Sequence, residues 1–154
     1  MLLENIKASG HVTIELFDFE GTLKERIEQE NLVVTVGKSF ITSRMKDATS
    51  AVMTSMAVGN GGATAPAVSQ TQLSGELGRV ALSSTTQVTT TVTNDTLQYQ
   101  ANFNAGTGSG ALTEAGLFNS NTPGAGTMLS RVVFAEINKG ANDSLQITWK
   151  LQIT

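Results

Sequence analysis

The sequence predicts a mainly β protein, an antiparallel β-sandwich of jelly-roll type with one amphipathic helix and a charged N-terminal hairpin or arm. The clearest evidence is the segment 145–153, where apolar and polar residues alternate at every position. A period of two is typical of a strand with one buried face. Turn-forming residues recur roughly every 8–15 residues, as in sandwiches and barrels. The length of 154 residues indicates one domain, in which we distinguish an N-terminal hairpin or arm, 1–36, from a sandwich, 37–154.

The N-terminal third of the chain is predicted to form a hairpin, a strand and the helix. Residues 12–30 are predicted to form two antiparallel strands joined by a turn at 18–21, where Asp and Gly favour a turn conformation. The β-branched run 31–36 predicts a second strand that Gly37 ends. A helix is predicted over 39–52, because apolar side chains recur there at helical spacing. We interpret this stripe as part of the core rather than a cofactor site; its members are Phe40, Ile41, Met45, Ala48 and Val52.

Short strands dominate the rest of the chain. The segment 71–77 is expected to form one or two helical turns, with Leu73 and Leu77 facing inward. An exposed Thr/Val-rich strand at 88–93 is expected to be able to pair edge to edge with a neighbouring molecule. Strands are predicted at 55–58, 79–93, 96–103, 110–118, 128–134 and 143–153, with turns at 94–95 and 137–142.

The composition excludes several classes of protein. The net charge of −3 offers no basic surface for nucleic acid. The absence of Cys excludes disulfides and thiolate metal sites and fits a reducing cytoplasm. No apolar run is long enough to span a membrane, and the first residues do not form a signal peptide.

Charged residues make up only 15% of the chain, against about 25% in an average soluble domain. Two interpretations stay open: a small sandwich rich in Thr, Ser, Asn and Gln, or a surface largely covered by neighbours in an assembly, because interface cores are depleted in charge. Most of the charged residues lie within 1–50. This segment is either a solvated hairpin or an arm that reaches a partner.

The search for catalytic chemistry yields no predicted catalytic, cofactor-binding or metal-binding residue. His11 is the only His and stands at the start of a strand, where an ordinary surface role is expected. Ser109 lies between two Gly but lacks the strand-to-helix setting of a nucleophile elbow. Glu114 and Glu136 are the one pair of acids worth inspecting for glycoside hydrolysis.

The loops do not form metal or phosphate sites either. The turn 18–21 lacks the ligand spacing of a calcium loop. The glycine-rich stretches 59–62 and 106–110 lack the Lys-Ser/Thr of a phosphate-binding loop. All three are interpreted as ordinary turns or loops, so no cofactor is expected.

The order of several motifs suggests a family. The motifs are Asn31–Lys38 before an amphipathic helix, Met56–Gly61, Thr71–Leu73 with Glu76, Leu77 and Arg79, Glu114–Asn119, Met128–Phe134 and the closing alternating strand. This ordered set resembles small structural proteins of tailed bacteriophages and is similar to the attachment modules that begin phage tail-collar fibres. The resemblance implies a virion component without catalytic activity.

Such a fibre continues into a shaft and a tip, whereas this sequence stops at Thr154, so we expect a stand-alone module. The preferred hypothesis is a capsid decoration (cement) protein, made in the bacterial host cytoplasm and located in the virion, that binds and stabilises the assembled head. The alternative is a tail or baseplate adaptor that anchors a tail fibre. Expected partners are the major capsid protein or tail and baseplate proteins, and further copies of the chain in a homo-oligomer. A carbohydrate-binding sandwich and a hydrolase that uses Glu114 or Glu136 remain as other hypotheses.

Overall fold

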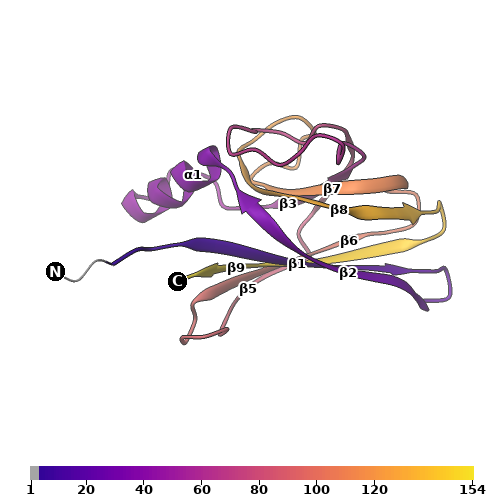
Figure 1. Cartoon of the computed structure of the whole chain (residues 1–154), viewed down its shortest axis with the longest axis horizontal. Helices are drawn as coiled ribbons and strands as arrows, with labels where there is room; N and C mark the ends of the chain where they lie inside the picture. The colour runs from indigo at the N-terminus through magenta and orange to yellow at the C-terminus, as the bar shows by residue number, and fades with distance from the viewer. Residues whose placement is uncertain (1–3) are drawn as a thin grey trace.

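The computed structural model describes residues 4–154 and is mainly β, as the sequence predicts (Figure 1). Within these residues the chain forms nine strands and one helix. Their bounds are β1 Ala8–Phe17, β2 Leu23–Val33, α1 Thr35–Lys46, β3 Ser55–Gly59, β4 Glu76–Ala81, β5 Ser84–Val88, β6 Thr96–Phe103, β7 Gly110–Phe118, β8 Met128–Lys139 and β9 Ser144–Ile153.

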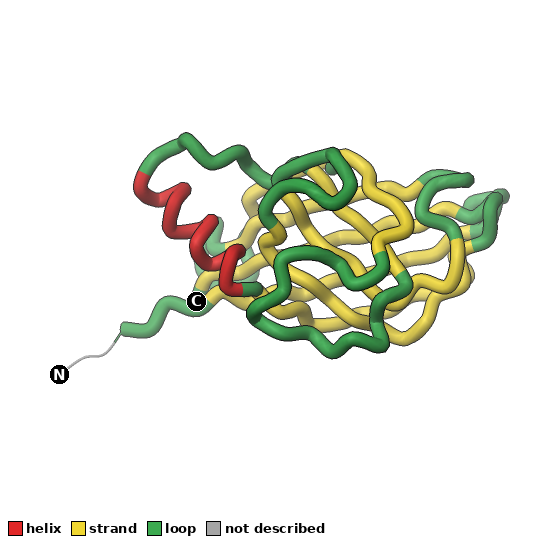
Figure 2. The backbone as a smooth tube through the Cα atoms, turned by 90° about the horizontal axis from the view of Figure 1, so that it is seen from above, coloured by secondary structure: helices red, strands yellow, loops and turns green. Residues whose placement is uncertain are grey.

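The strands form one antiparallel sheet that curls into two layers (Figures 1 and 2). The order is β4-β3-β7-β8-β2-β1-β9-β6-β5. Strand β2 joins the layers, because it pairs with β1 along most of its length and with β8 only at Leu32 and Val33. We call β2, β1, β9, β6 and β5 the first layer and β4, β3, β7 and β8 the second layer. The expected antiparallel, sandwich-like fold is therefore confirmed.

The main core lies between the two layers. Val12, Ile14 and Leu16 alternate inward along β1 and are almost completely buried. Their partners on β9 belong to the same core: Val12 is opposite Trp149, and Ile14 is opposite Ile147. Since β1 lies between β2 and β9, the N-terminal hairpin and the remaining strands share one core.

Helix α1 covers Thr35–Lys46 rather than the predicted 39–52. Its last turn ends at Asp47, whose backbone is extended and whose carboxylate accepts hydrogen bonds from the N–H and hydroxyl of Thr49. Such local bonds compete with helical ones. Gly37 lies inside the first turn of α1 instead of ending a strand, because β2 already ends at Val33. A glycine is required there, since a Cβ would collide with the backbone carbonyl of Leu129. Of the predicted core stripe, Phe40 and Ile41 pack against the core, whereas Met45, Ala48 and Val52 are exposed, contrary to the prediction.

The prediction of helical turns at 71–77 is wrong. The chain is a loop as far as Gly75, and β4 begins at Glu76; Leu77 is exposed while Leu73 is buried. The backbone N–H groups of Ser74 and Gly75 donate to the carboxylate of Glu114. A distant side chain therefore takes the donors that a helix would have used.

The expected strand at 88–93 is also wrong beyond its first residue. Strand β5 ends at Val88, and 89–95 forms a turn. The backbone N–H groups of Thr90, Thr91 and Val92 all donate to the carboxylate of Asp95. These bonds hold the pKa of Asp95 well below its usual value.

Two further boundaries differ from the prediction. Residues 23–33 form one continuous strand, β2, and β8 extends to Lys139, so that the last turn covers 140–143 rather than 137–142. The strand predicted at 96–103 is found as β6 with the same bounds.

Candidate binding surface

Two loops, 60–75 and 119–127, cover the outer face of the second layer (Figure 1). We call these two segments the loop platform. Neither segment contains a charged residue, and most of their residues are exposed. A second, small core fills the space beneath them; its buried members are Val34, Ala57, Leu73, Phe118 and Met128.

The first loop is held by a buried ion pair. Glu114 on β7 and Arg131 on β8 have no solvent exposure, and the Arg131 Nη2 atom lies 2.7 Å from Glu114 Oε2. The Nε of Arg131 donates to the same oxygen at 2.9 Å. Both strands turn these side chains toward the outer face of the layer, below the loop 60–75.

Both ions of this pair also bind the backbone of the loop. Glu114 accepts hydrogen bonds from the N–H groups of Gly61, Ser74 and Gly75 at 2.9, 3.1 and 2.7 Å. Arg131 donates to the carbonyl oxygens of Thr64 and Gly61 and to the side-chain oxygen of Gln70. A buried ion pair is favourable only when such hydrogen bonds complete its polar groups. The pair therefore ties both ends of the loop to the sheet.

The second loop is held by Arg79 on β4. Its guanidinium makes a two-point contact with the carboxylate of Glu76 and donates to the carbonyl oxygens of Ser120 and Ala125, both at 2.9 Å. It also lies 3.9 Å from the centre of the Phe118 ring, a cation–π contact. The planar guanidinium suits this combination of stacking and fork-shaped bonding.

The loop platform is thus an exposed surface of fixed shape. Its charges lie below it, inside the protein, and its upper side offers backbone groups, hydroxyls, amides and small apolar side chains. Val68 is the large apolar side chain among them, with 50% of its surface exposed. Such a surface is suited to binding another protein surface, because little conformational entropy is lost when a rigid loop docks.

The two candidate acids of the sequence are not brought together. Glu114 is buried in the ion pair with Arg131. Glu136 is exposed on β8 and accepts a hydrogen bond from the side chain of Asn138. The geometry does not form the pair of facing carboxyl groups that glycoside hydrolysis requires.

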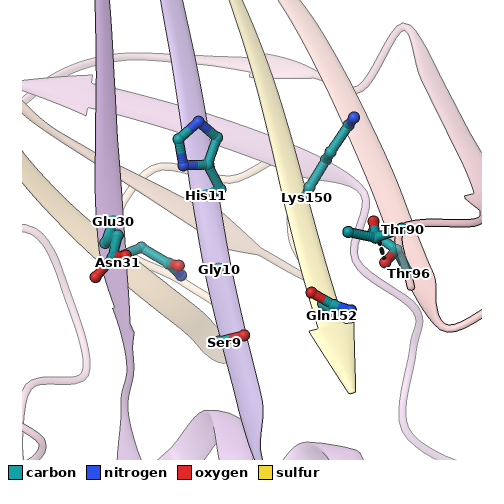
Figure 3. Close-up of a pocket in the computed structure, with 9 residues that line it drawn as sticks. All are labelled: Ser9, Gly10, His11, Glu30, Asn31, Thr90, Thr96, Lys150 and Gln152. Carbon is teal, nitrogen blue, oxygen red and sulfur yellow. Dashed lines mark hydrogen bonds between the residues drawn. The ribbon is translucent and has the colours of Figure 1, made fainter. Parts of the chain in front are cut away.

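His11 lies in a polar hollow of about 410 Å³ on the first layer (Figure 3). Glu30, His11 and Lys150 stand side by side on β2, β1 and β9, as Figure 3 shows, and do not converge on one point. The nearest carboxylate to the His11 Nε2 atom is that of Glu28, at 4.0 Å. Within residues 4–154 no hydroxyl is hydrogen-bonded to this imidazole, so the hollow lacks an activated nucleophile.

The remaining candidate segments form loops. At the turn 18–21 the Asp18 carboxylate accepts hydrogen bonds from the backbone of Glu20 and Thr22. Ser109 precedes β7 and has a buried hydroxyl without a partner among the described residues. Within the same residues, no three acidic or imidazole side chains gather closely enough to hold a metal ion. None of the helical structure described is long and apolar enough to cross a bilayer.

A separate cluster of charges lies at the end of the β8–β9 hairpin. Lys24 of β2 donates to Asp143 at 2.9 Å, and the backbone N–H of Gly140 donates to the same carboxylate. These bonds hold the pKa of Asp143 below its usual value. Lys139 is nearly buried and donates to the carbonyl of Asn104, and this burial lowers the pKa of its ammonium group.

Sequence reasoning missed the roles of Arg131 and Arg79. A signal for Arg131 was present, because this charge interrupts an apolar strand segment, 128–134. A charge at such a position requires a buried partner, and Glu114 on the preceding strand was the available acid. Arg79 carried no comparable signal, since its neighbours are of mixed polarity.

Comparison with known proteins gives no relative to this chain. No family model matches it. No curated protein matches it either, and neither does a solved structure.

Proposed function

We propose that this chain is a structural protein of a tailed-bacteriophage virion, and specifically a decoration protein that binds and stabilises the assembled head. The loop platform is the observation that supports this function best. It combines an uncharged, exposed surface with a shape fixed by buried ions. The ordered motifs that resemble phage structural proteins point to the same class.

The charged groups that hold the loop platform support binding to another surface rather than catalysis. The buried ions Glu114 and Arg131 are fully engaged with each other and with the loop backbone. Arg79 is engaged in the same way with Glu76 and the second loop. Each of these groups fixes a surface and none is left free to act on a bound molecule.

The stabilisation follows from mass action. A protein that binds the assembled lattice, but not the separated subunits, shifts the equilibrium toward the lattice. Repeated weak contacts across neighbouring subunits reinforce one another through their effective concentration. Apolar area buried at each contact contributes about 25 cal/mol per Å² before the costs of ordering are subtracted.

The location of the protein in virions tests this proposal. Immunogold labelling of particles of the phage that encodes the chain should show many copies over the head. A few copies at the tail would overturn the decoration proposal and favour the tail or baseplate adaptor. Failure to find the chain in particles at all would overturn both.

The surface itself is tested by binding to heads prepared without the protein. Val68→Asp places a charge on the loop platform and should weaken binding at least tenfold. Phe19→Asp is the matched control, because Phe19 is an exposed apolar residue in the β1–β2 turn. Equal binding by both variants would show that the loop platform is not the contact surface.

A further inference from the structure

An apolar pocket opens at the end of the sandwich, between α1 and the strands. Its volume is about 570 Å³, and its walls come from the helix, the segment after it and both layers. Three of the lining side chains are substantially exposed: Met45 at 77%, Val52 at 54% and Leu97 at 37%. Concentrated apolar exposure of this kind marks an interaction site.

The pocket lies beside a strand edge that has no partner among the described residues. Thr85 belongs both to the pocket wall and to β5, the terminal strand of the first layer. On its other side β5 has no partner strand among the described residues, and its sequence contains no charge and no Pro. Charged side chains and Pro are two of the devices by which natural proteins protect exposed edges. Strand β2 has such charges along 23–30, where it is rich in Lys, Arg and Glu.

An open edge next to an apolar pocket is the arrangement used for strand addition. The added segment pairs its main chain with the edge and places an apolar side chain in the pocket. The occupant must therefore be an extended segment with an exposed apolar residue.

The N-terminal segment 4–7 of this chain has these properties. It precedes β1, it is exposed, and Ile6 has 80% of its surface exposed. It lies at the same end of the molecule as α1, as Figures 1 and 2 show. Glu4 is two positions from Ile6 and so projects on the same side of an extended segment, while Arg44 contributes a positive charge to the pocket wall.

A second copy of the chain supplies this segment more readily than the same copy. Strands β9 and β6 lie between β1 and β5, so the chain's own segment starts roughly 14 Å from the β5 edge at the usual strand spacing. Its hydrogen bonds between Lys7 and Thr154 also tie its base to β9. To reach β5 of its own copy, the segment would have to cross the end of the first layer and could not run alongside β5.

We propose that residues 4–6 of a second copy add to the edge of β5, with Ile6 in the apolar pocket and Glu4 facing Arg44, while Lys7 keeps its backbone hydrogen bonds to Thr154 of its own copy. The contact is head-to-tail, since one copy contributes its segment and the next contributes its pocket. Such contacts form closed rings when the rotation between copies allows it. The proposal concerns the purified chain alone and does not depend on the virion assignment.

The oligomeric state tests the proposal. Sedimentation velocity over a range of concentrations should show oligomers for the wild-type chain. Ile6→Asp and Val52→Asp should each raise the dissociation constant at least about 30-fold, as expected for a central apolar contact. Phe19→Asp is the control for Ile6→Asp, because Phe19 is equally exposed at 79%; it should leave the oligomer intact. Thr86→Lys, which charges the edge, should also dissociate it.

Mixing the two variants separates this geometry from others. Ile6→Asp retains the unchanged pocket, and Val52→Asp retains the unchanged N-terminal segment. In an equimolar mixture the segment of Val52→Asp can bind the pocket of Ile6→Asp, so dimers with one intact contact should form. A wild-type chain that stays monomeric, or oligomers that survive Ile6→Asp, would overturn the proposal. If the wild-type chain is a monomer and an apolar dye enters the pocket of Ile6→Asp but not that of the wild type, each chain fills the pocket with its own segment. Far-UV circular dichroism confirms that each variant is folded.

Discussion

Replacing Glu114 by Gln should destabilise the fold far more than a surface substitution. The amide keeps the shape of the carboxyl group but removes the charge opposite Arg131, which has no solvent exposure. It also replaces one acceptor oxygen with a donor, facing either the guanidinium or backbone N–H groups of the loop 60–75. Breaking a buried pair in this way costs about 3–5 kcal/mol.

Urea unfolding measures this loss. Trp149 is the only Trp and is completely buried, so its fluorescence reports the unfolding of the core. With a slope of about 2 kcal/mol per molar urea, the midpoint should fall by roughly 2 M. The concentration of protein must be held constant, because association contributes to apparent stability. Glu136→Gln makes the same chemical change on the exposed face of β8 and should alter stability by less than about 0.5 kcal/mol.

A double substitution separates the ion pair from its surroundings. Glu114→Gln combined with Arg131→Met removes both charges, so the loss should be smaller than the sum of the two single losses by more than about 1 kcal/mol. Strictly additive losses, or a loss below about 1 kcal/mol for Glu114→Gln alone, would refute the assignment of the pair as the anchor of the loop 60–75.

Three further predictions concern other parts of the structure. Gly37→Ala should destabilise by about 1–3 kcal/mol in urea unfolding, despite a helix-propensity gain of up to about 1 kcal/mol, because the added methyl group meets a backbone carbonyl of β8; a net gain would contradict this packing. Arg79→Met should make the loop 119–127 more sensitive to limited proteolysis, since two carbonyl bonds are lost; an unchanged cleavage rate would exclude this role. The lowered pKa of Asp143 in the folded state adds stability that is present above the unfolded pKa of about 4 and is lost as the pH falls through the folded value. In Lys24→Met the melting temperature should therefore fall less steeply with decreasing pH than in the wild type. Identical pH profiles of the two proteins would contradict the contribution of the Lys24–Asp143 bond.

The sequence by itself determined the class of fold and the strands whose faces are strictly divided. Strand β9 was predictable because Leu145, Ile147 and Trp149 alternate with polar residues and are all buried. Strand β6 was predictable with its bounds, because turn residues flank a regular alternation. In both cases the information is local: a period of two fixes the buried face whatever the strand packs against.

Only the tertiary structure decided where regular structure stops and what the polar residues do. The backbone at 74–75 is bonded to Glu114, about forty positions away, and the segment therefore forms a loop in spite of its helical spacing. Glu114 itself was visible as an acid in a strand, but its partner Arg131 becomes its neighbour only when β7 and β8 pair. The loop platform arises from contacts between segments far apart in the chain, and the periodicity of a single segment contains no information about such contacts.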